Sequence, residues 1–438
     1  MAFTEHPLRR ELVHEMHLRR FAPVEAPARI IQMVCLIDED EREAEQQHLA
    51  NAPVSPHAQE RERRHAVLHF DDGVVFLWER HTEATTITLI ARSNVRDTHE
   101  AHALADWLAA WPGVVLRATR VFVEPSDSEA EALLPEMRFE EQDLVSCLVC
   151  SNVRVWSDFR IREDGYGRLL LSAPGREPDD LGRIVQRLQE LGNYRNLALV
   201  GLPPVQRLMP ELNTLESQLA EYSQLLIDDG KGEDEDLLLD LSTVSAKLAR
   251  LRAENSYRTS ASQAYAQIAA DRLEALKVEP IDGFQSLRDF TERRLVPATR
   301  TIDTFNGRLR RLSERSGDAI ALLNTRIDTR IKAQNLELLR SMDSTFNLQL
   351  RLQNLVEVLS VIAASYYAVA LIAYMAKGAK AFGKGEIVDV AIGLVTPAVI
   401  LTIFLLVSRI RHRFIRETED AADRSKKSDA LKPPGKGL

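Results

Sequence analysis

The sequence predicts an α+β cytoplasmic head domain, then a long helical hairpin and stalk, and finally two C-terminal transmembrane helices. Short β-branched and aromatic runs follow one another from Arg29 to about Ala173, as they do in a sheet domain. After Pro174 the pattern becomes helical, and one apolar stripe continues for more than about ten turns. Val358–Ala376 and Val390–Ser408 then each run nineteen residues without a charge, about the length of a bilayer-spanning helix.

The predicted head domain covers residues 29–175, after an N-terminal arm at residues 1–28. Two of its strands flank Asp71-Asp72-Gly73, which is typical of a tight hairpin. A helix is predicted from about Thr98 to Trp111. Antiparallel pairs of local strands beside a helix favour an α+β sheet domain. The predicted strands are Ile30–Ile37, His65–Phe70, Gly73–Trp78, Thr85–Ala91, Gly113–Val123, Leu144–Val149 and Arg168–Ser172.

The predicted stalk domain covers residues 176–357. An amphipathic helix is expected over Asp179–Leu191, ended by Gly192. Val205–Leu226 and Asp236–Leu276 follow, and the short acidic turn between them predicts an antiparallel helical hairpin.

One apolar stripe then repeats in steps of three, four or seven residues, which keeps it on one helix face. No stop signal separates this helix from the first membrane span, so we expect one continuous helix. The stripe needs a partner, either the hairpin Val205–Leu276 or the same helix of another subunit. Its residues are Phe305, Leu309, Leu312, Ala319, Leu323, Ile327, Ile331, Leu338, Met342 and Phe346.

The membrane segment is predicted at residues 358–408, as a hairpin of the two spans 358–376 and 390–408, followed by a basic tail at residues 409–438. Seven Lys or Arg residues lie within about twenty residues after the second span, and the chain starts with a polar stretch rather than a signal peptide. The two spans predict a multi-pass membrane protein, and the charges predict that both termini lie in the cytoplasm.

The net charge and the cysteine content indicate which partners and which cellular compartment to expect. The net charge is −9, and the body of the chain before the membrane segment is more acidic still, so nucleic acid is not expected as a partner. The three cysteines suit a reducing compartment. Cys147 and Cys150 have the spacing of a redox or zinc pair, but they lie in an expected strand, and we predict that they pack in the core.

A polar stripe precedes the first predicted span. Its residues are spaced by four, four and three, so they share one face of the stalk helix. In a ring of subunits, Glu357 could form an anionic ring around a pore. Alternatively, the stripe could lie at the membrane interface and bond to neighbouring helices or water. The stripe comprises Gln349, Gln353, Glu357 and Ser360.

A second candidate polar site lies in the head domain. Glu79, His81 and Glu83 would share one face if their segment were a strand. Two carboxylates around a histidine could tune a general base or hold a divalent cation. The structural alternative is an interface that pairs with Arg160 or Arg162. Because no catalytic constellation is recognised, we expect no enzyme, and we assign no catalytic, cofactor-binding or metal-binding residue.

Several local strings carry a resemblance to a known family. The chain resembles the bacterial membrane-anchored proteins built on domain of unknown function 3422, over roughly His6 to Lys377. The resemblance implies a protein of the bacterial inner membrane and assigns no reaction. The strings include His6-Pro-Leu-Arg9, Trp78-Glu-Arg-His-Thr-Glu83, Ser157-Asp-Phe-Arg160, Tyr194-Arg195, Glu292-Arg-Arg-Leu-Val-Pro-Ala298 and Gln349-Leu-Arg-Leu-Gln353.

The overall plan is also similar to that of the CorA-type magnesium channels, which carry Gly-Met-Asn after the first span. Here that place reads Ala373-Tyr-Met-Ala376, and the following loop is net positive, which disfavours a divalent cation. We therefore expect a non-enzymatic, homo-oligomeric scaffold anchored in the lipid bilayer. The alternative is a CorA-like ion channel with its pore along the stalk and first span. Small residues in that span would allow close helix approach: Ser360, Ala363, Ala364 and Ser365.

Overall fold

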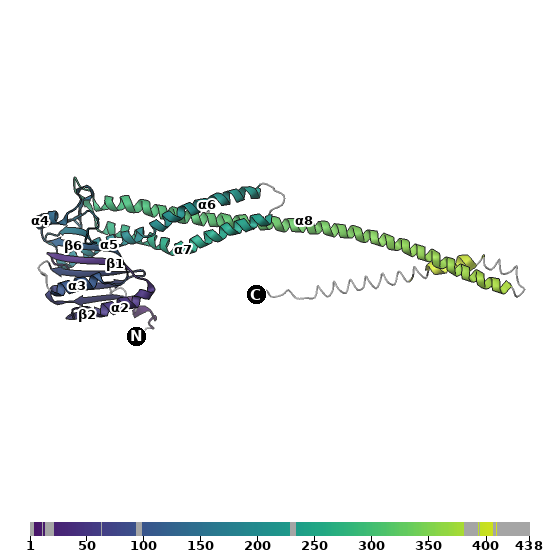
Figure 1. The fold of residues 1–438 in the computed structure, drawn as a ribbon, viewed down its shortest axis with the longest axis horizontal. Coiled ribbons are helices and arrows are strands. Elements are labelled where there is room, and N and C mark those ends of the chain that lie inside the picture. Colours follow the sequence, from purple (N-terminus) through teal and green to yellow (C-terminus); the bar gives the residue numbers. More distant parts are fainter. Residues whose placement is uncertain are drawn as a thin grey trace. The chain divides into compact units, whose positions relative to one another are not determined.

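The computed structural model describes residues 4–10, 12–13, 22–62, 64–92, 99–227, 234–380, 393, 395–405 and 409. The chain divides into two compact units, Met1–Asn324 and Thr325–Leu438 (Figure 1). Most of the predicted tail and the predicted loop between the two spans lie outside the described residues. Of the second predicted span, the structure describes residue 393 and the apolar helix Val395–Leu405.

Ten strands of the first unit form one sheet, in the order β10-β7-β8-β9-β6-β1-β5-β4-β3-β2. All neighbouring strands pair antiparallel except β6 and β9, which are parallel. The predicted hairpin is confirmed, because β3 and β4 pair on either side of the turn Asp71–Gly73. The strands are β1 (Ala28–Leu36), β2 (Ala58–Arg61), β3 (His65–His69), β4 (Val75–Arg80), β5 (Ala84–Arg92), β6 (Val114–Glu124), β7 (Val145–Val149), β8 (Val153–Ser157), β9 (Gly167–Ser172) and β10 (Glu279–Pro280).

One face of the sheet is covered by three helices: α2 (Arg42–Ala50), α3 (His99–Ala109) and α4 (Asp127–Met137). Side chains alternate between the faces along each strand, so one strand contributes side chains to a core on each face of the sheet. On this face, Phe76 packs against Trp107 of α3, with ring centroids 4.8 Å apart. Farther along the sheet, Trp156 and Leu170 pack under α4.

The opposite face packs against α5 (Pro178–Leu199), which α7 (Asp234–Ala275) covers in turn (Figure 1). The buried apolar residues of the sheet in this layer come from β7, β8, β9, β6 and β1, including Ile30, Val121 and Leu171. The head is therefore a mostly antiparallel sheet between two helical layers. This arrangement confirms the predicted sheet domain in the N-terminal part of the chain.

Helix α5 extends farther than the sequence suggested. The predicted end at Gly192 is wrong, because α5 continues to Leu199. A Cβ atom at Gly192 would lie 2.7–2.8 Å from the guanidinium of Arg117, so any larger residue there would displace this guanidinium. Gly192 thus marks where the helix packs on a charged strand residue, and it does not end the helix.

Helices α6 (Leu202–Ile227) and α7 pack against each other as the predicted hairpin, and the turn between them lies outside the described residues. The next helix, α8, is continuous over Leu287–Lys380, as the predicted stalk requires. Its N-terminal part contacts the hairpin: Arg308 donates a 2.8 Å hydrogen bond to Asn213 of α6, and Gln263 of α7 bonds to Asp303.

The apolar stripe of α8 is covered in one unit and open in the other. In the first unit its side chains are buried at Phe305, Leu309, Leu312 and Leu323. The hairpin of the same chain therefore covers this half of the stripe. In the second unit, the stripe residues Ile331, Leu338, Met342 and Phe346 are 48–67% exposed.

Among the described helices, one is long and apolar enough to cross a membrane: α8, in its C-terminal part. Only 6% of that apolar stretch is buried. The helix Val395–Leu405 is apolar but shorter than a span. The first of the two predicted spans thus has the length and composition of a membrane helix.

The environments of the buried cysteines predict slow alkylation. Burial raises the pKa of the Cys35 thiol to about 12, with a further contribution from Glu45, and burial raises that of Cys147 to about 11. At pH 8.5 the reactive thiolate is therefore scarce at both residues in the native protein. We expect iodoacetamide to modify them more than about 100-fold more slowly in native protein than in urea. Peptide mass spectrometry measures both rates, and equal rates would contradict this picture of the core.

Candidate functional site

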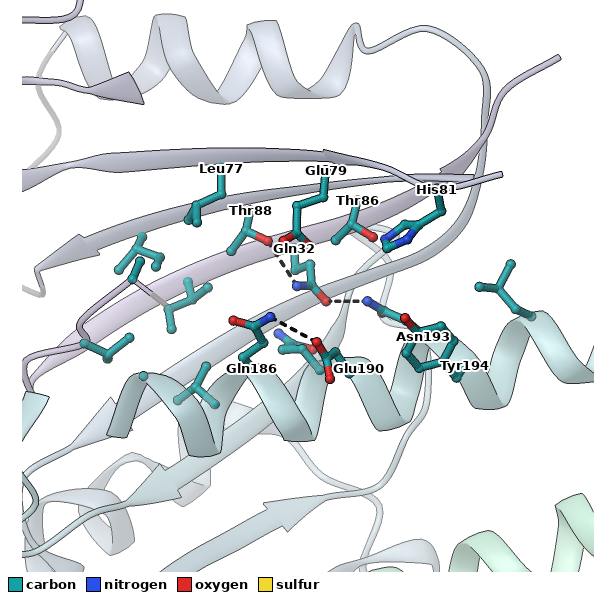
Figure 2. Close-up of a pocket in the computed structure, with 18 residues that line it drawn as sticks. Gln32, Leu77, Glu79, His81, Thr86, Thr88, Gln186, Glu190, Asn193 and Tyr194 are labelled. Atoms are coloured by element: carbon teal, nitrogen blue, oxygen red, sulfur yellow. Dashed lines mark hydrogen bonds between the residues drawn. The ribbon is translucent and has the colours of Figure 1, made fainter. Parts of the chain in front are cut away.

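A small pocket of about 60 Å³ lies between the sheet face formed by β1, β4 and β5 and the overlying helix α5 (Figure 2). Gln32, Thr86 and Thr88 enter it from the sheet, and Asn193 and Tyr194 enter it from α5. These polar residues sit where an apolar interface would be expected. The pocket is therefore the first candidate site in the head.

Buried amide groups connect the two layers of this pocket. Gln32 donates to Thr88 Oγ1 at 3.0 Å, and its Oε1 accepts from Asn193 Nδ2 at 3.0 Å (Figure 2). Gln189, one turn earlier on α5, accepts from Arg117 at 2.7 Å, while its own amide nitrogen is buried with no partner in the described part of the chain. Satisfied buried amides fix the register of helix on sheet, since losing one leaves its partner unpaired.

Arg117 of β6 completes this network without a carboxylate. Its Nη1 donates to Asn193 Oδ1 at 2.8 Å and to Gln32 Oε1 at 3.3 Å, so all of its hydrogen-bond partners are amide oxygens. Burial and the like charge of Arg195 lower the pKa of the Arg117 guanidinium to about 9. Arg117 is therefore still cationic at neutral pH, and no carboxylate of the described residues bonds to it.

The structure separates the three predicted head-site residues. Glu79 and His81 line the pocket (Figure 2), but Glu83 does not. Glu83 lies before β5 and forms a 2.6 Å ion pair with Arg258 of α7. Burial, with the nearby Glu83 carboxylate second, raises the pKa of the Tyr265 hydroxyl. Glu83 therefore ties the sheet to α7.

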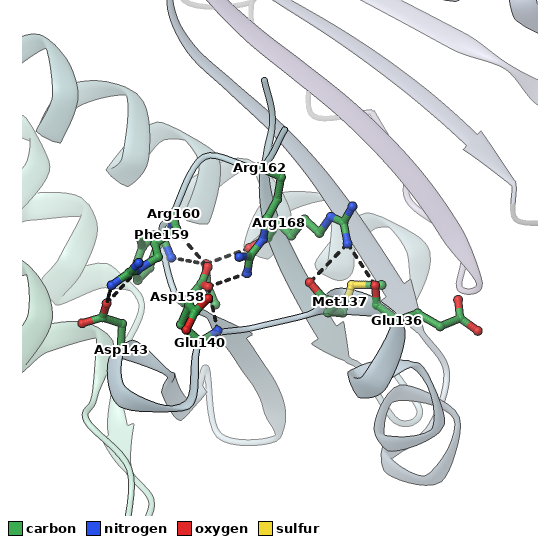
Figure 3. Close-up of polar contacts among 10 residues, drawn as sticks. Glu136, Met137, Glu140, Asp143, Asp158, Phe159, Arg160, Arg162 and Arg168 are labelled. Atoms are coloured by element: carbon green, nitrogen blue, oxygen red, sulfur yellow. Dashed lines mark hydrogen bonds and ion pairs between the residues drawn. The ribbon is translucent and has the colours of Figure 1, made fainter. Parts of the chain in front are cut away.

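The arginines expected to pair with this segment have other partners. Arg160 pairs with Asp143 at 2.6 Å, and Arg162 pairs with Asp158 (Figure 3). In the part of the chain that the structure describes, no three His, Cys, Asp or Glu side chains are grouped to hold a metal ion. A general-base or cation-binding role for His81 stays a prediction.

The predicted stalk stripe lies on α8 in the second unit. Gln349, Gln353 and Ser360 are exposed, Glu357 is half-buried, and the Ser360 hydroxyl donates to the Val356 carbonyl at 2.7 Å. Their shared helical face follows from the continuity of α8. Their role at a pore or an interface stays a prediction.

Sequence reasoning missed the residues that build the pocket. Gln32, Arg117 and Asn193 are far apart in the chain and belong to no recognisable motif. The available signal was a polar residue inside an apolar strand, as in Ile30-Ile-Gln-Met-Val34. Chemically, the pocket offers amides, hydroxyls, two carboxylates (Glu79 and Glu190) and one imidazole, which suit the binding of a small polar molecule or water.

The comparisons with known proteins assign no activity. The sequence model of the family described as protein of unknown function (DUF3422) matches residues 4–414. No curated protein and no solved structure matches the chain.

Proposed function

We propose that this chain, which belongs to the DUF3422 family, is a membrane-anchored, homo-oligomeric scaffold without enzymatic activity. The observation that carries the proposal is the C-terminal part of α8. From Ile331 to Met375 it presents large apolar side chains to solvent along most of its length. Exposed apolar surface of this extent indicates a membrane or a protein partner.

The membrane part of the proposal rests on residues 358–376, which form the apolar end of α8. A helix is the structure that satisfies its own backbone in lipid. We place the second crossing at residues 390–408, of which Val395–Leu405 is an apolar helix. The cations of the tail then favour cytoplasmic termini in the inner membrane of a bacterium.

The oligomer rests on the open half of the stripe, at Ile331, Leu338, Met342 and Phe346. The same stripe is buried by the chain's own hairpin up to Leu323, so an equivalent cover is expected beyond it. A second copy of α8 has a matching apolar face, as in a coiled coil. The ion pair of Glu83 with Arg258 favours a structural role for that predicted site over an enzymatic one.

A matched pair of cysteine variants tests the oligomer in membranes. We expect Met342→Cys to form a disulfide-linked dimer on mild oxidation, because position 342 faces the second subunit. Arg340→Cys lies about 200° away around the helix, so it should stay monomeric. Both variants carry Cys150→Ser, and non-reducing gels measure the dimer. Equal cross-linking of the two variants would argue against a stripe-to-stripe interface.

Alkaline carbonate extraction tests the anchor separately. We expect the full chain to stay with the vesicles and a chain ending at residue 357 to enter the soluble fraction. Release of the full chain would exclude a membrane-spanning α8, whatever the cross-linking shows.

The polar stripe gives one reason to keep the channel alternative. Gln349, Gln353 and Glu357 share a face of α8 directly before its apolar end. If that face lines a pore, liposomes containing the protein should conduct Mg²⁺, Co²⁺ or K⁺, and Glu357→Gln should reduce the flux. Absence of flux in an inserted oligomer would exclude the channel and leave the scaffold.

A further inference from the structure

A second, larger cavity of about 220 Å³ lies on the same side of the sheet, between β6, β8, β9 and α5. Most of its wall is apolar, and it includes Val155, Leu169 and Leu188. Three arginines also line it, Arg117, Arg168 and Arg195, and its lining contains no Asp or Glu. An apolar cavity with cations on one side suits a molecule that has an anionic end and an apolar end.

Arg195 of α5 is the most unusual of the three arginines. It is 8% exposed, and its Nη1 is buried without a hydrogen-bond partner among the residues that the structure describes. In the described residues, it forms no ion pair with a carboxylate. Buried charges in proteins are normally paired, because an unpaired charge loses its hydration without compensation. Arg195 therefore lacks the counter-charge that its burial requires.

Aromatic rings hold the Arg195 guanidinium in place. It lies 4.5 Å from the ring centroid of Phe159 and 5.2 Å from that of Phe290. Such contacts fix a cation but leave its N–H groups free for an acceptor. Burial, and then the like charge of Arg294, lower its pKa to about 10, so it is cationic at neutral pH.

A constrained loop supplies the aromatic ring (Figure 3). Phe159 has a φ of +53°, in the left-handed region, which is uncommon for a bulky residue. Its backbone N–H donates to Ser157 Oγ at 3.1 Å, and its ring stacks on Phe290 with centroids 4.3 Å apart. Asp158, beside it, anchors the loop by several bonds (Figure 3). Strained residues are enriched at ligand sites.

Arg168 also lines the cavity, but its guanidinium is directed toward α4 on the opposite face of the sheet. It donates to the carbonyl oxygens of Glu136 and Met137 at 2.9 and 3.2 Å (Figure 3), and its Nε is buried without a partner. Its nearest carboxylate is Asp164, at 3.9 Å. Arg195 and Arg117 are therefore the cations that an anion in the cavity would meet.

We propose that this cavity binds a small organic oxyanion, a carboxylate or phosphate monoester with a short apolar body, and that Arg195 is its anchor. The anion supplies the missing counter-charge and accepts hydrogen bonds from the guanidinium. The apolar body lies against Val155, Leu169 and Leu188. This site is independent of membrane anchoring and of oligomer formation, and it gives the head domain a ligand-binding role beyond the scaffold.

Titration calorimetry on the full-length protein in detergent tests the site. The probes are sodium butyrate, butyl phosphate and inorganic phosphate, at constant ionic strength against sodium chloride. We expect butyl phosphate or butyrate to bind wild-type protein, and Arg195→Met to weaken that binding by at least about tenfold. Arg183→Gln removes an arginine on the same helix that pairs with Asp180, and its dissociation constant should stay within about twofold of wild type.

Thermal unfolding separates binding from packing. Arg195→Met removes an unpaired buried cation, so without anion it should unfold at or above the wild-type temperature. The anion should stabilise wild type and not the variant. A variant that unfolds earlier with and without anion, yet binds as wild type does, would assign Arg195 a packing role alone and overturn the proposal.

Ile161 provides a test that does not disturb the core. It lines the cavity and is 78% exposed, so charged substitutions there should leave the fold intact. Ile161→Glu should weaken anion binding several-fold, and Ile161→Lys should strengthen it. Preference for butyl phosphate or for butyrate identifies the head group. Failure of all three probes to bind above chloride, or equal binding by both Ile161 variants, would overturn the site.

Discussion

Replacing Glu45 with alanine is expected to destabilise the first unit by about 3–5 kcal/mol, the effect of removing one partner of a buried ion pair. Glu45 lies on α2 and is fully buried against the sheet. Its Oε1 accepts from Trp78 Nε1 at 2.9 Å, and its Oε2 accepts from Arg80 at 2.8 and 3.2 Å. The pair thus joins α2 to the C-terminal end of β4.

The size of the effect comes from what the substitution leaves behind. The Arg80 side chain is 12% exposed and would become a cation without its counter-charge. The indole N–H of Trp78, which is 1% exposed, would lose its acceptor. The Arg80 guanidinium, 5.1 Å from the Trp78 ring centroid, would retain only that weaker contact.

Thermal unfolding of the full-length protein in detergent measures this prediction, with a fall in Tm of about 5–15 °C expected for Glu45→Ala. Glu45→Gln should lie between the variant and wild type, because it keeps the acceptor and loses the charge. Glu43→Ala is the control on the exposed side of α2, expected within about 0.5 kcal/mol of wild type. A Glu45→Ala protein as stable as the control would mean that α2 does not pack as described.

Local sequence patterns were sufficient to predict most strands of the sheet. β1, β5 and β6 are rich in β-branched and aromatic residues, and their predicted ranges match the observed strands closely. The turn Asp71–Gly73 could be predicted from its Asp-Gly pair, because glycine readily adopts the positive φ that this turn requires. Gly73 has a φ of +72°. These features depend on neighbouring residues, so a single sequence contains the information.

The elements that were missed lack apolar periodicity. α2 reads Arg-Glu-Ala-Glu-Gln-Gln-His-Leu-Ala, and only Glu45 and Leu49 of it are buried. All four residues of β2 are exposed. Such elements form because tertiary contacts hold them, and a hydrophobicity pattern does not report those contacts.

The residues that line the pockets could not be predicted from the sequence for a related reason. Asn193 and Gln32, which hydrogen-bond in the first pocket, are 161 residues apart. Gly192 followed a common signal for a helix end, but its observed role is to admit the Arg117 guanidinium. The predicted Glu79, His81 and Glu83 set assumed one strand, and the chain turns at His81 before Glu83 reaches α7. Side-chain partners from distant segments decide these outcomes.

The sequence left open which partner covers the apolar stripe of α8, the hairpin of the same chain or another subunit. The period of the stripe predicted a partner but could not say which one. For Phe305 to Leu323 the partner is the hairpin α6–α7 of the same chain. For Ile331 to Phe346 no cover is present among the described residues, so the second alternative, another subunit, is the one we propose there.

Replacing Asp158 with alanine is the second large effect that we expect, again about 3–5 kcal/mol. The Asp158 side chain is fully buried and pairs with Arg162, which is 15% exposed. Its two carboxylate oxygens also accept from the backbone N–H groups of Glu140 and Arg160, at 3.0 and 3.1 Å (Figure 3). Alanine would leave a buried cation and two backbone donors unpaired.

In Asp158→Ala, the loop around residue 158 should unfold before the rest of the unit does, because Asp158 holds the loop that places Phe159 over Arg195. Limited trypsin digestion of the native protein should therefore cut Asp158→Ala after Arg160 or Arg162 under conditions that leave wild type intact. Asp143→Ala is the control in the same region: its ion pair with Arg160 is partly exposed, so less than about 1 kcal/mol should be lost. If Asp143→Ala and Asp158→Ala were cut equally fast, burial would not distinguish the two carboxylates. The loop would then be held by its other contacts, such as the bond from the Phe159 N–H to Ser157 Oγ.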